Sequence, residues 1–427
     1  MGVYSAQMRV VISHKPGLFF VPSATSALIE GTMDLQAFRE EVQSFLANHC
    51  PPSARGKGET VTIGSKRPMK DPELLKWRHA LGERGWNVPM WPKEYGGGGL
   101  SHEEATVLMN EVGKIDARLP MPGMGTSMIG PTLLEYGTEE QKKQHIPGIA
   151  SGDVSWCQGY SEPGAGSDLA SLRTKAEDKG DFYEVNGQKI WTSGAQFADW
   201  IFALVRTDFE VPKHEGISFV LMDMNQPGIS VKPIQLISGT SPFCETFFDN
   251  AIAHKVDLVG QLNRGWTVGK RLLQHERSGQ GGIGGAPSRK AAPTPRLQDI
   301  AKEYIGTDSA GRIADRGARD DVIRMAMNSK SFRLTQKRAQ QENASGQTPG
   351  EATSIFKLYG ATLTRETSEM KCQLMGTQGF GWEGDSFKRI EVESTREFLG
   401  ARAHTIYGGT NEVQMNIVAK RVLGLPD

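Results

Sequence analysis

Apolar and charged residues follow a helical period from Met33 onward. In MDLQAFREEVQSFLANH the apolar positions recur every three or four residues, which predicts a helix with one buried face. They are Leu35, Phe38, Val42, Phe45 and Leu46. Similar spacing predicts helices around 73–84, 102–117 and 138–146; the last opens with Thr138, a capping residue, and two glutamates. Residues 33 to about 150 are therefore expected to be all-helical.

The pattern changes to short strands near residue 155. FYEVNGQKIWTSG places Asn186-Gly187 between two runs rich in aromatic and β-branched residues, which is the strongest short-range signal for a hairpin turn. Four more such runs follow, each bounded by Gly, Pro, Asn or Asp: WIFALVR, GISFVLMDM, GISVKPIQLI and CETFFDNAIA. Residues 155 to about 260 are therefore expected to form an antiparallel β domain.

Helical spacing returns at Trp266, with Val268 and Leu272 on one face. It continues in two later groups: Ile355 with Leu358 and Tyr359, and Met370 with Leu374. Residues 278–295 are too rich in Gly and Pro for a simple helix. The order of helices, sheet and helices predicts an α+β protein of about three domains, given roughly 150 residues per domain.

Composition excludes several classes of partner. Lysine plus arginine and aspartate plus glutamate both total 49, so no charge imbalance favours nucleic acid or an anionic membrane surface. The cysteines stand alone, without the spacing of a metal site, which suits a reducing compartment. They are Cys50, Cys157, Cys244 and Cys372. No run reaches the roughly 20 apolar residues of a membrane span, so a soluble, cytoplasmic protein is expected.

Residues 1–32 lack an acid before Glu30 and carry only Arg9 and Lys15 as bases. This faintly resembles a transit peptide, which would place the protein in the mitochondrial matrix. The segment is not arginine-rich, however. We expect it to be a disordered or non-native extension, because the first clear helical pattern starts at Met33.

The segment YSEPGAGSDLAS, residues 160–171, is a candidate anion site. Gly164 and Gly166 would let backbone N–H groups approach a pyrophosphate, and the Ser167 hydroxyl adds a donor. An ordinary turn at Pro163-Gly164 stays open as the alternative. The segment matches neither a Walker loop nor the GxGxxG pattern.

Together with four other segments, this stretch closely resembles the acyl-CoA dehydrogenase family. The others are WNVPMWPKEYGGGG, GTEEQKKQHIPGIASGD, KIWTSGAQFADW, and QLMGTQGFGWEG followed by RAHTIYGGTNEVQMNIVAKRVLG. The resemblance covers about 33–427. It implies an N-terminal helical domain (33–152), a middle β domain (153–262) and a C-terminal four-helix bundle (263–427). It also implies FAD between the β domain and the bundle and across a subunit interface, hence a homodimer or homotetramer.

Carried over position by position, the resemblance assigns cofactor contacts. Tyr160 and Ser161 would lie at the flavin edge, Gly166 and Ser167 near the pyrophosphate, Trp191 over one flavin face, and Ser193 near N5. Gln158 is also expected to bind the cofactor. A core role for Trp191 is the alternative. Gln373, Gly376 and Thr377 match the segment whose backbone meets the FAD of a neighbouring subunit. Thr410 and Glu412 match family positions near the adenosine and diphosphate. Thr410 also suits a helix N-cap, and Glu412 suits a first helical turn.

The reaction implied removes a proton from Cα and a hydride from Cβ of an acyl-CoA thioester. Some family members carry the base in a YEGT sequence, but this chain has Tyr407-Gly408-Gly409-Thr410. A second group takes it from an ER pair on a helix at the start of the bundle, which QHERSG matches. The resemblance therefore assigns the base to Glu276 and the oxyanion site to the Gly408 N–H with a ribityl hydroxyl of FAD. Ser167, Arg277 and Tyr407 would contact substrate.

A buried base would have a raised pKa, which a neighbouring cation such as Arg277 would oppose. A surface cation at a helix C-terminus is the alternative role for Arg277. The RxxFG-like sequence whose arginine reaches the neighbour's FAD is absent; the chain has MNSKSFRLTQKRAQQ instead, so no residue is assigned to that contact. The glycines of 278–295 suggest a widened pocket for a long, branched or ring-bearing acyl group.

The expected function is FAD-dependent acyl-CoA dehydrogenation in fatty-acid β-oxidation, with electrons passed to an electron-transfer flavoprotein. No metal and no nucleic acid are expected. An oxidase that uses oxygen, or a relative that performs an elimination, would keep the fold and change the chemistry. A catalytically silent subunit of a hetero-oligomer is the non-enzymatic alternative.

Overall fold

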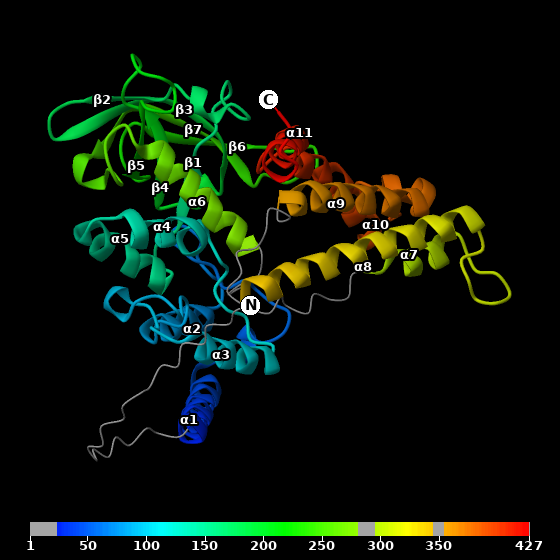
Figure 1. Cartoon of the computed structure of the whole chain (residues 1–427). Helices are drawn as coiled ribbons and strands as arrows, with labels where there is room; N and C mark the ends of the chain where they lie inside the picture. Colours follow the sequence, from blue (N-terminus) through cyan, green and yellow to red (C-terminus); the bar gives the residue numbers. More distant parts are fainter. Residues whose placement is uncertain (1–23, 281–294, 345–353, 427) are drawn as a thin grey trace, which may run out of the picture.

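The computed structural model describes residues 24–280, 295–344 and 354–426 (Figure 1). Its first part is helical, with no strand from Ala24 to Ser151. The helices are α1 (Ala24–His49), α2 (Pro72–Glu83), α3 (His102–Lys114), the π-helical η3 (Gly125–Ile129), α4 (Gly130–Tyr136) and α5 (Glu139–Ser151). The expected cap is confirmed: the Thr138 hydroxyl accepts a hydrogen bond from the Gln141 N–H at 3.2 Å, at the start of α5. Sequence patterns did not predict η3 and α4.

Helix α1 corrects the expected start of ordered structure. It begins at Ala24 rather than Met33, so part of the segment expected to be disordered is helical. The physical reason is that residues 24–30 read ATSALIE and contain no helix breaker. Residues 1–23 lie outside the described part of the chain.

Seven strands form one mixed sheet in the order β1-β4-β2-β3-β7-β6, with β5 on β4. They are β1 (Trp156–Gly159), β2 (Lys175–Asp178), β3 (Phe182–Ser193), β4 (Trp200–Arg206), β5 (Ile217–Asp223), β6 (Ile229–Ile234) and β7 (Phe243–His254). The four strands expected after β3 are all present. Most pairs are antiparallel, but β1 and β2 each pair with β4 in parallel.

The hairpin expected at Asn186-Gly187 is wrong. Strand β3 runs straight through these residues, and the turn that joins β2 to β3 carries Gly180, at φ 93°. Neighbouring strands on both sides override the local turn preference: Asn186 pairs with Lys175 of β2, and Gly187 pairs with Phe248 of β7. A side chain at 187 would meet the Thr174 backbone, which explains the glycine.

Helix α6 (Gly265–Gln280) packs on strands β4 and β5 and on helices η3 and α4. Val268 and Leu272 are buried there, as their spacing predicted, in a core shared with Ile129 of η3 and Phe219 of β5. One hydrophobic core therefore joins the N-terminal helices, the sheet and α6 (Figure 1). Beyond Gln280, the Gly/Pro-rich stretch lies outside the described residues up to 294.

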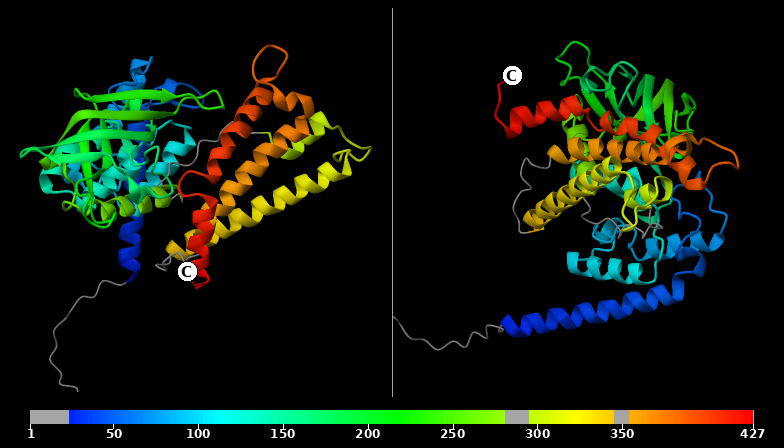
Figure 2. Two further views of the ribbon diagram at one scale, coloured as in Figure 1. Left: turned by 90° about the horizontal axis from the view of Figure 1, so that it is seen from above. Right: turned by 90° about the vertical axis from the view of Figure 1, so that its right-hand side faces the viewer.

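The remaining helices form a bundle beside this body (Figure 2). They are α7 (Leu297–Tyr304), α8 (Arg316–Ala344), α9 (Ser354–Met375), α10 (Arg389–Ala401) and the short α11 (Asn411–Ile417), which rests on α9. The bundle meets the sheet where Gly239, between β6 and β7, lies against the Trp382 ring. Within the described ranges, no helix combines the length and hydrophobicity that a bilayer crossing requires.

Candidate active site

The segment after β1 is fixed by a buried ion pair. The Glu162 carboxylate accepts hydrogen bonds from Lys189 Nζ at 2.8 Å and from the N–H groups of Arg173 and Thr174 at 2.7 and 2.8 Å. Lys189 is 0% exposed and also donates to the Tyr160 carbonyl oxygen at 3.2 Å. Burial lowers the pKa of Lys189 to about 8, although Glu162 opposes that shift. The pair ties residues 160–162 to strand β3.

The predicted pyrophosphate residues lie at the tip of this segment. Gly166 and Ser167 are exposed, and a Cβ built on Gly164 or Gly166 would meet no atom within 4 Å. Asp168, the next residue, instead pairs with Lys213 at 2.8 Å. The tip therefore has open space around its backbone groups, as an anion site requires. The Glu162–Lys189 ion pair holds the segment in place.

Of the residues expected at the flavin edge, Tyr160 has its side chain in the core. It is 5% exposed, its ring lies edge-on to Phe202 and Phe219, and its hydroxyl donates to the Gly269 carbonyl of α6 at 3.4 Å. Gln158, two residues earlier, has a buried Nε2 without an acceptor among the described residues. An unsatisfied buried amide is costly, so this position favours a bound acceptor.

Trp191 is turned out of the sheet by a β-bulge. Along β3 the odd-numbered residues Tyr183, Val185 and Lys189 are buried, so a regular strand would bury residue 191 as well. Between its pairs at Lys189 and Thr192, β3 uses one residue more than β7, which reverses the alternation. Trp191 is 52% exposed at φ 62°, a backbone conformation that costs about 1–3 kcal/mol outside glycine. Such strain clusters at functional sites.

Ser193, two residues on, opens into a cleft of about 520 Å³. One wall belongs to the sheet and its loops; the other comes from two N-terminal segments, the loop with Ile63 and Arg67 and the start of η3. The lining is mainly apolar and includes Met121, Met124, Met128, Trp156, Phe197 and Pro242. Sequence patterns did not point to the loop at 63–67, because this segment has no periodicity and no recognisable motif.

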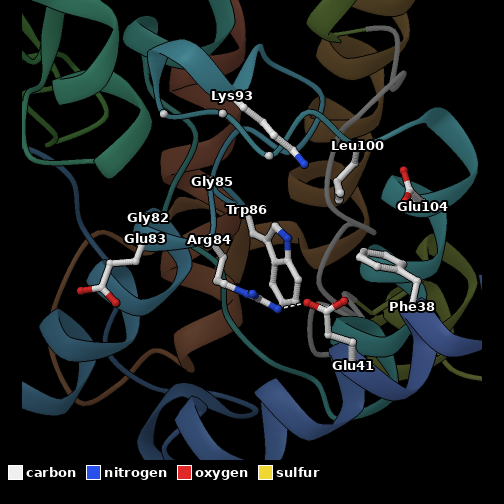
Figure 3. Close-up of a pocket in the computed structure, with 13 residues that line it drawn as sticks. Phe38, Glu41, Gly82, Glu83, Arg84, Gly85, Trp86, Lys93, Leu100 and Glu104 are labelled. Atoms are coloured by element: carbon white, nitrogen blue, oxygen red, sulfur yellow. Dashed lines mark hydrogen bonds and ion pairs between the residues drawn. The ribbon is translucent and has the colours of Figure 1, made fainter.

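A second cavity, of about 460 Å³, lies between α1 and the loop at 96–100 (Figure 3). Arg84 forms an ion pair with Glu41 there, and its guanidinium lies over the Trp86 ring at 5.0 Å. The charged groups around it have mixed sign, and none of the predicted site residues lines it. It is therefore the weaker candidate for catalysis.

The proposed base lies on helix α6, in its last turns. Arg271 Nε donates to a Glu135 oxygen of α4 at 2.8 Å, and His275 Nε2 is 3.3 Å from the same atom. These contacts hold α6 against the helices whose first turn lines the cleft. Positions 276 and 277 continue this helix, but the side chains of Glu276 and Arg277 lie outside the described part of the structure.

The second set of predicted residues lies on the bundle. Gln373, Gly376 and Thr377 are exposed at the end of α9. Among the described residues no hydrogen bond or ion pair joins them, or the segment 407–412, to Trp191 or Ser193. Of the predicted cofactor residues, Ser193 alone lines the cleft within the described part of the chain.

The Tyr407–Glu412 segment is a turn that leads into α11. Gly408 has φ 64°, and the Tyr407 ring is 49% exposed. The expected N-cap is confirmed, because the Thr410 hydroxyl accepts from the Val413 N–H at 3.2 Å. The backbone N–H of Glu412 and the Thr410 hydroxyl hold the pKa of the Glu412 carboxyl below its usual value. Both side chains thus have roles in the helix start.

Comparison with known proteins matches all three parts. The acyl-CoA dehydrogenase N-terminal, middle and C-terminal domain families match residues 32–153, 157–251 and 263–423. Acyl-CoA dehydrogenase IpdE1 of Mycobacterium tuberculosis is 35% identical over 400 residues, covering 92% of this chain and 98% of the relative. The structure titled Tcur3481-Tcur3483 steroid ACAD is 31% identical with a TM-score of 0.68, over 92% of this chain and 98% of that one.

The ChsE4-ChsE5 complex from Mycobacterium tuberculosis is 29% identical with a TM-score of 0.66, over 92% of this chain and 98% of that one. The three domain matches follow the observed order of helices, sheet and helices along nearly the whole chain. The chain therefore belongs to the acyl-CoA dehydrogenase family, FAD-dependent enzymes that dehydrogenate acyl-CoA thioesters.

Proposed function

We propose that this chain binds FAD and dehydrogenates a bulky, ring-bearing acyl-CoA to the trans-2-enoyl-CoA, with electrons passed to an electron-transfer flavoprotein. The observation that carries the proposal is the bulge in β3. It exposes a strained Trp191 two residues before Ser193, and Ser193 lines a cleft that also meets η3, which packs against α6.

The residues present fit FAD. Gln158 offers an unsatisfied buried amide, Gly164 and Gly166 leave room for a diphosphate, and Trp191 presents an exposed ring to a flat partner. Ser193 stands at the cleft to donate its hydroxyl to the flavin edge. When bound, FAD supplies the acceptor for the hydride that leaves Cβ.

The chain's own groups would accept the proton and stabilise the oxyanion. In this proposal Glu276 takes the proton from Cα, so that the double bond forms as the hydride leaves. The Gly408 N–H donates to the thioester oxygen and stabilises its developing negative charge. Arg277 supports the site beside the base, and Ser167 and Tyr407 contact the CoA thioester. At φ 64°, position 408 suits glycine better than a carboxylate-bearing residue.

Two observations favour a ring-bearing acyl group. A cleft of about 520 Å³ is within the usual range for ligands of drug size, roughly 300–1,000 Å³. Two solved relatives carry the words steroid ACAD in their titles.

The bacterial relatives also support a cytoplasmic protein.

The assembly is proposed to be hetero-oligomeric, in place of the homo-oligomer expected from sequence. One solved relative is a complex of ChsE4 with ChsE5, and another title pairs Tcur3481 with Tcur3483. The exposure of Gln373, Gly376 and Thr377 leaves these residues free to meet the FAD of a neighbouring chain. A second chain that supplies the reactive site would make this chain the silent subunit, which is the alternative function.

Anaerobic flavin bleaching tests the proposal. Wild-type protein and Glu276→Gln, alone and with any co-purifying chain, are mixed with butyryl-CoA and with ring-bearing thioesters, and the flavin absorbance is followed. Bleaching of the wild type by ring-bearing thioesters, lost in Glu276→Gln with FAD retained, supports the function and the base. FAD that no thioester reduces points to the silent subunit, and preference for butyryl-CoA refutes the acyl class.

A further inference from the structure

Arg67 is the one cation among the residues that line the 520 Å³ cleft, within the described part of the chain. Its guanidinium carbon lies 4.1 Å from the centre of the Phe197 ring, a cation–π contact. A guanidinium nitrogen lies 4.0 Å from the Cβ position of Gly194, next to Ser193. The cation therefore stands beside the proposed reaction site.

Three neighbouring contacts fix the loop that carries Arg67. The Thr62 hydroxyl donates to the Arg67 carbonyl oxygen at 2.8 Å, and Lys66 Nζ donates to the Ala198 carbonyl oxygen at 2.8 Å. The Ser65 N–H donates to Asp199 at 3.2 Å. The N-terminal loop is thus tied to the segment between β3 and β4, so the position of Arg67 does not depend on the Phe197 stack alone.

No carboxylate forms an ion pair with Arg67 within the described residues. Asp199, which holds the same loop, accepts from the Ser155 N–H at 2.7 Å and from the Ser155 hydroxyl at 2.8 Å, in addition to Ser65. Arginine offers five N–H donors in a planar fork that suits a carboxylate. A half-buried guanidinium without an acid partner is therefore available to a ligand oxygen.

The other lining residues indicate the polarity of the ligand that the cleft can bind. Its lining is mainly apolar, which suits a hydrocarbon ring system. Trp156, 5% exposed, contributes an indole N–H without an acceptor among the described residues. Arg67 thus borders a mainly apolar space whose other polar lining residues are Ser127, Ser155 and Ser193. This pattern fits a largely apolar acyl group that carries an oxygen acceptor.

We propose that Arg67 is a specificity-determining residue that binds an oxygen on the acyl group, a carboxylate or a ring carbonyl, away from the thioester. The inference rests on the proposed function, in that the cleft holds the acyl group. It predicts that this enzyme prefers an oxygenated ring over the same ring without oxygen.

The test compares binding of cyclohexylpropanoyl-CoA with that of its ring-keto and ring-carboxyl counterparts. Calorimetry in a Glu276→Gln background measures affinity without turnover. Arg67→Met should weaken one or both oxygenated thioesters about ten- to a hundredfold, the usual worth of a hydrogen bond to a charged group, and leave the hydrocarbon thioester unchanged. Arg67→Lys should restore part of the affinity for the carboxyl compound, because the charge returns.

Lys66→Met is the matched control, because it removes a cation of the same loop that does not line the cleft. Equal losses for all three thioesters, or equal losses in Lys66→Met, would show that the loop is merely loosened and would overturn the proposal. Loss of FAD in Arg67→Met alone would assign the arginine to the cofactor and also overturn it. If no thioester bleaches the wild-type flavin but oxygen-selective binding depends on Arg67, the proposed reaction fails and this inference stands.

Discussion

Replacing Lys189 by methionine tests the ion pair beneath the candidate cofactor site. The variant keeps the length of the side chain but removes its hydrogen bonds to Glu162 and to the Tyr160 carbonyl. Breaking a buried pair from one side costs about 3–5 kcal/mol. The lower end applies here, because the Glu162 carboxylate keeps the backbone N–H groups of Arg173 and Thr174. Urea unfolding should therefore show a loss of about 3 kcal/mol in the free energy of unfolding.

Two further variants decide the cause of that loss. Lys189→Met combined with Glu162→Gln should recover part of it, because the uncompensated charge is gone. Lys179→Met removes an exposed lysine of the same domain, which is paired with Glu177 at 3.1 Å, and should leave stability unchanged. A loss below about 1 kcal/mol in Lys189→Met, or a double variant no more stable than the single one, would refute the reasoning.

Three other outcomes follow from the packing. Leu272→Ala should cost about 2–5 kcal/mol in thermal unfolding, because this leucine is fully buried between α6 and the sheet; a negligible cost would show that α6 is not docked. Gly187→Ala should destabilise more than Gly180→Ala, since its Cβ would lie 2.8 Å from the Thr174 backbone while Gly180 has free space; equal melting temperatures would contradict the observed pairing of β3. Burial opposes ionisation of Glu162, but its partners outweigh burial and hold its pKa below 4.5. Its contribution to stability is therefore full above pH 4.5 and lost as the pH falls through the lowered pKa, and Glu162→Gln should flatten that acid limb in a pH series of unfolding curves.

Periodicity predicted the elements whose burial follows a simple repeat. The strands from Trp200 to His254 and the helices opened by Asp71, Ser101 and Thr138 are in place, because alternating or helical patterns and caps are local properties. The turn at Asn186-Gly187 failed for the opposite reason. Its preference is local, whereas the extended backbone there is set by partner strands on both sides.

The site residues were assigned by family resemblance, and these assignments stay predictions. Ser193 lines the 520 Å³ cleft and Gln158 has a buried amide nitrogen without an acceptor among the described residues, but no rule of alternation predicts an outward Trp191. Arg67 could not be found from the sequence, because its role depends on Phe197, 130 residues away in the chain, reaching the same spot. Assignments on the bundle and at Glu276 stay predictions.

Because of the bulge in β3, the outward position of Trp191 depends more on the number of residues in this strand than on the identity of most of its side chains. A deletion of one residue between Lys189 and Thr192 would remove the bulge: Thr192 would stay buried opposite Cys244, and the strained backbone that presents the Trp191 ring would be lost. Substitutions on the exposed face of the strand leave its pairing register with β7 intact. Within this stretch, evolution can therefore exchange side chains far more freely than it can insert or delete a single residue, and a variant library for this protein should vary identity at fixed length.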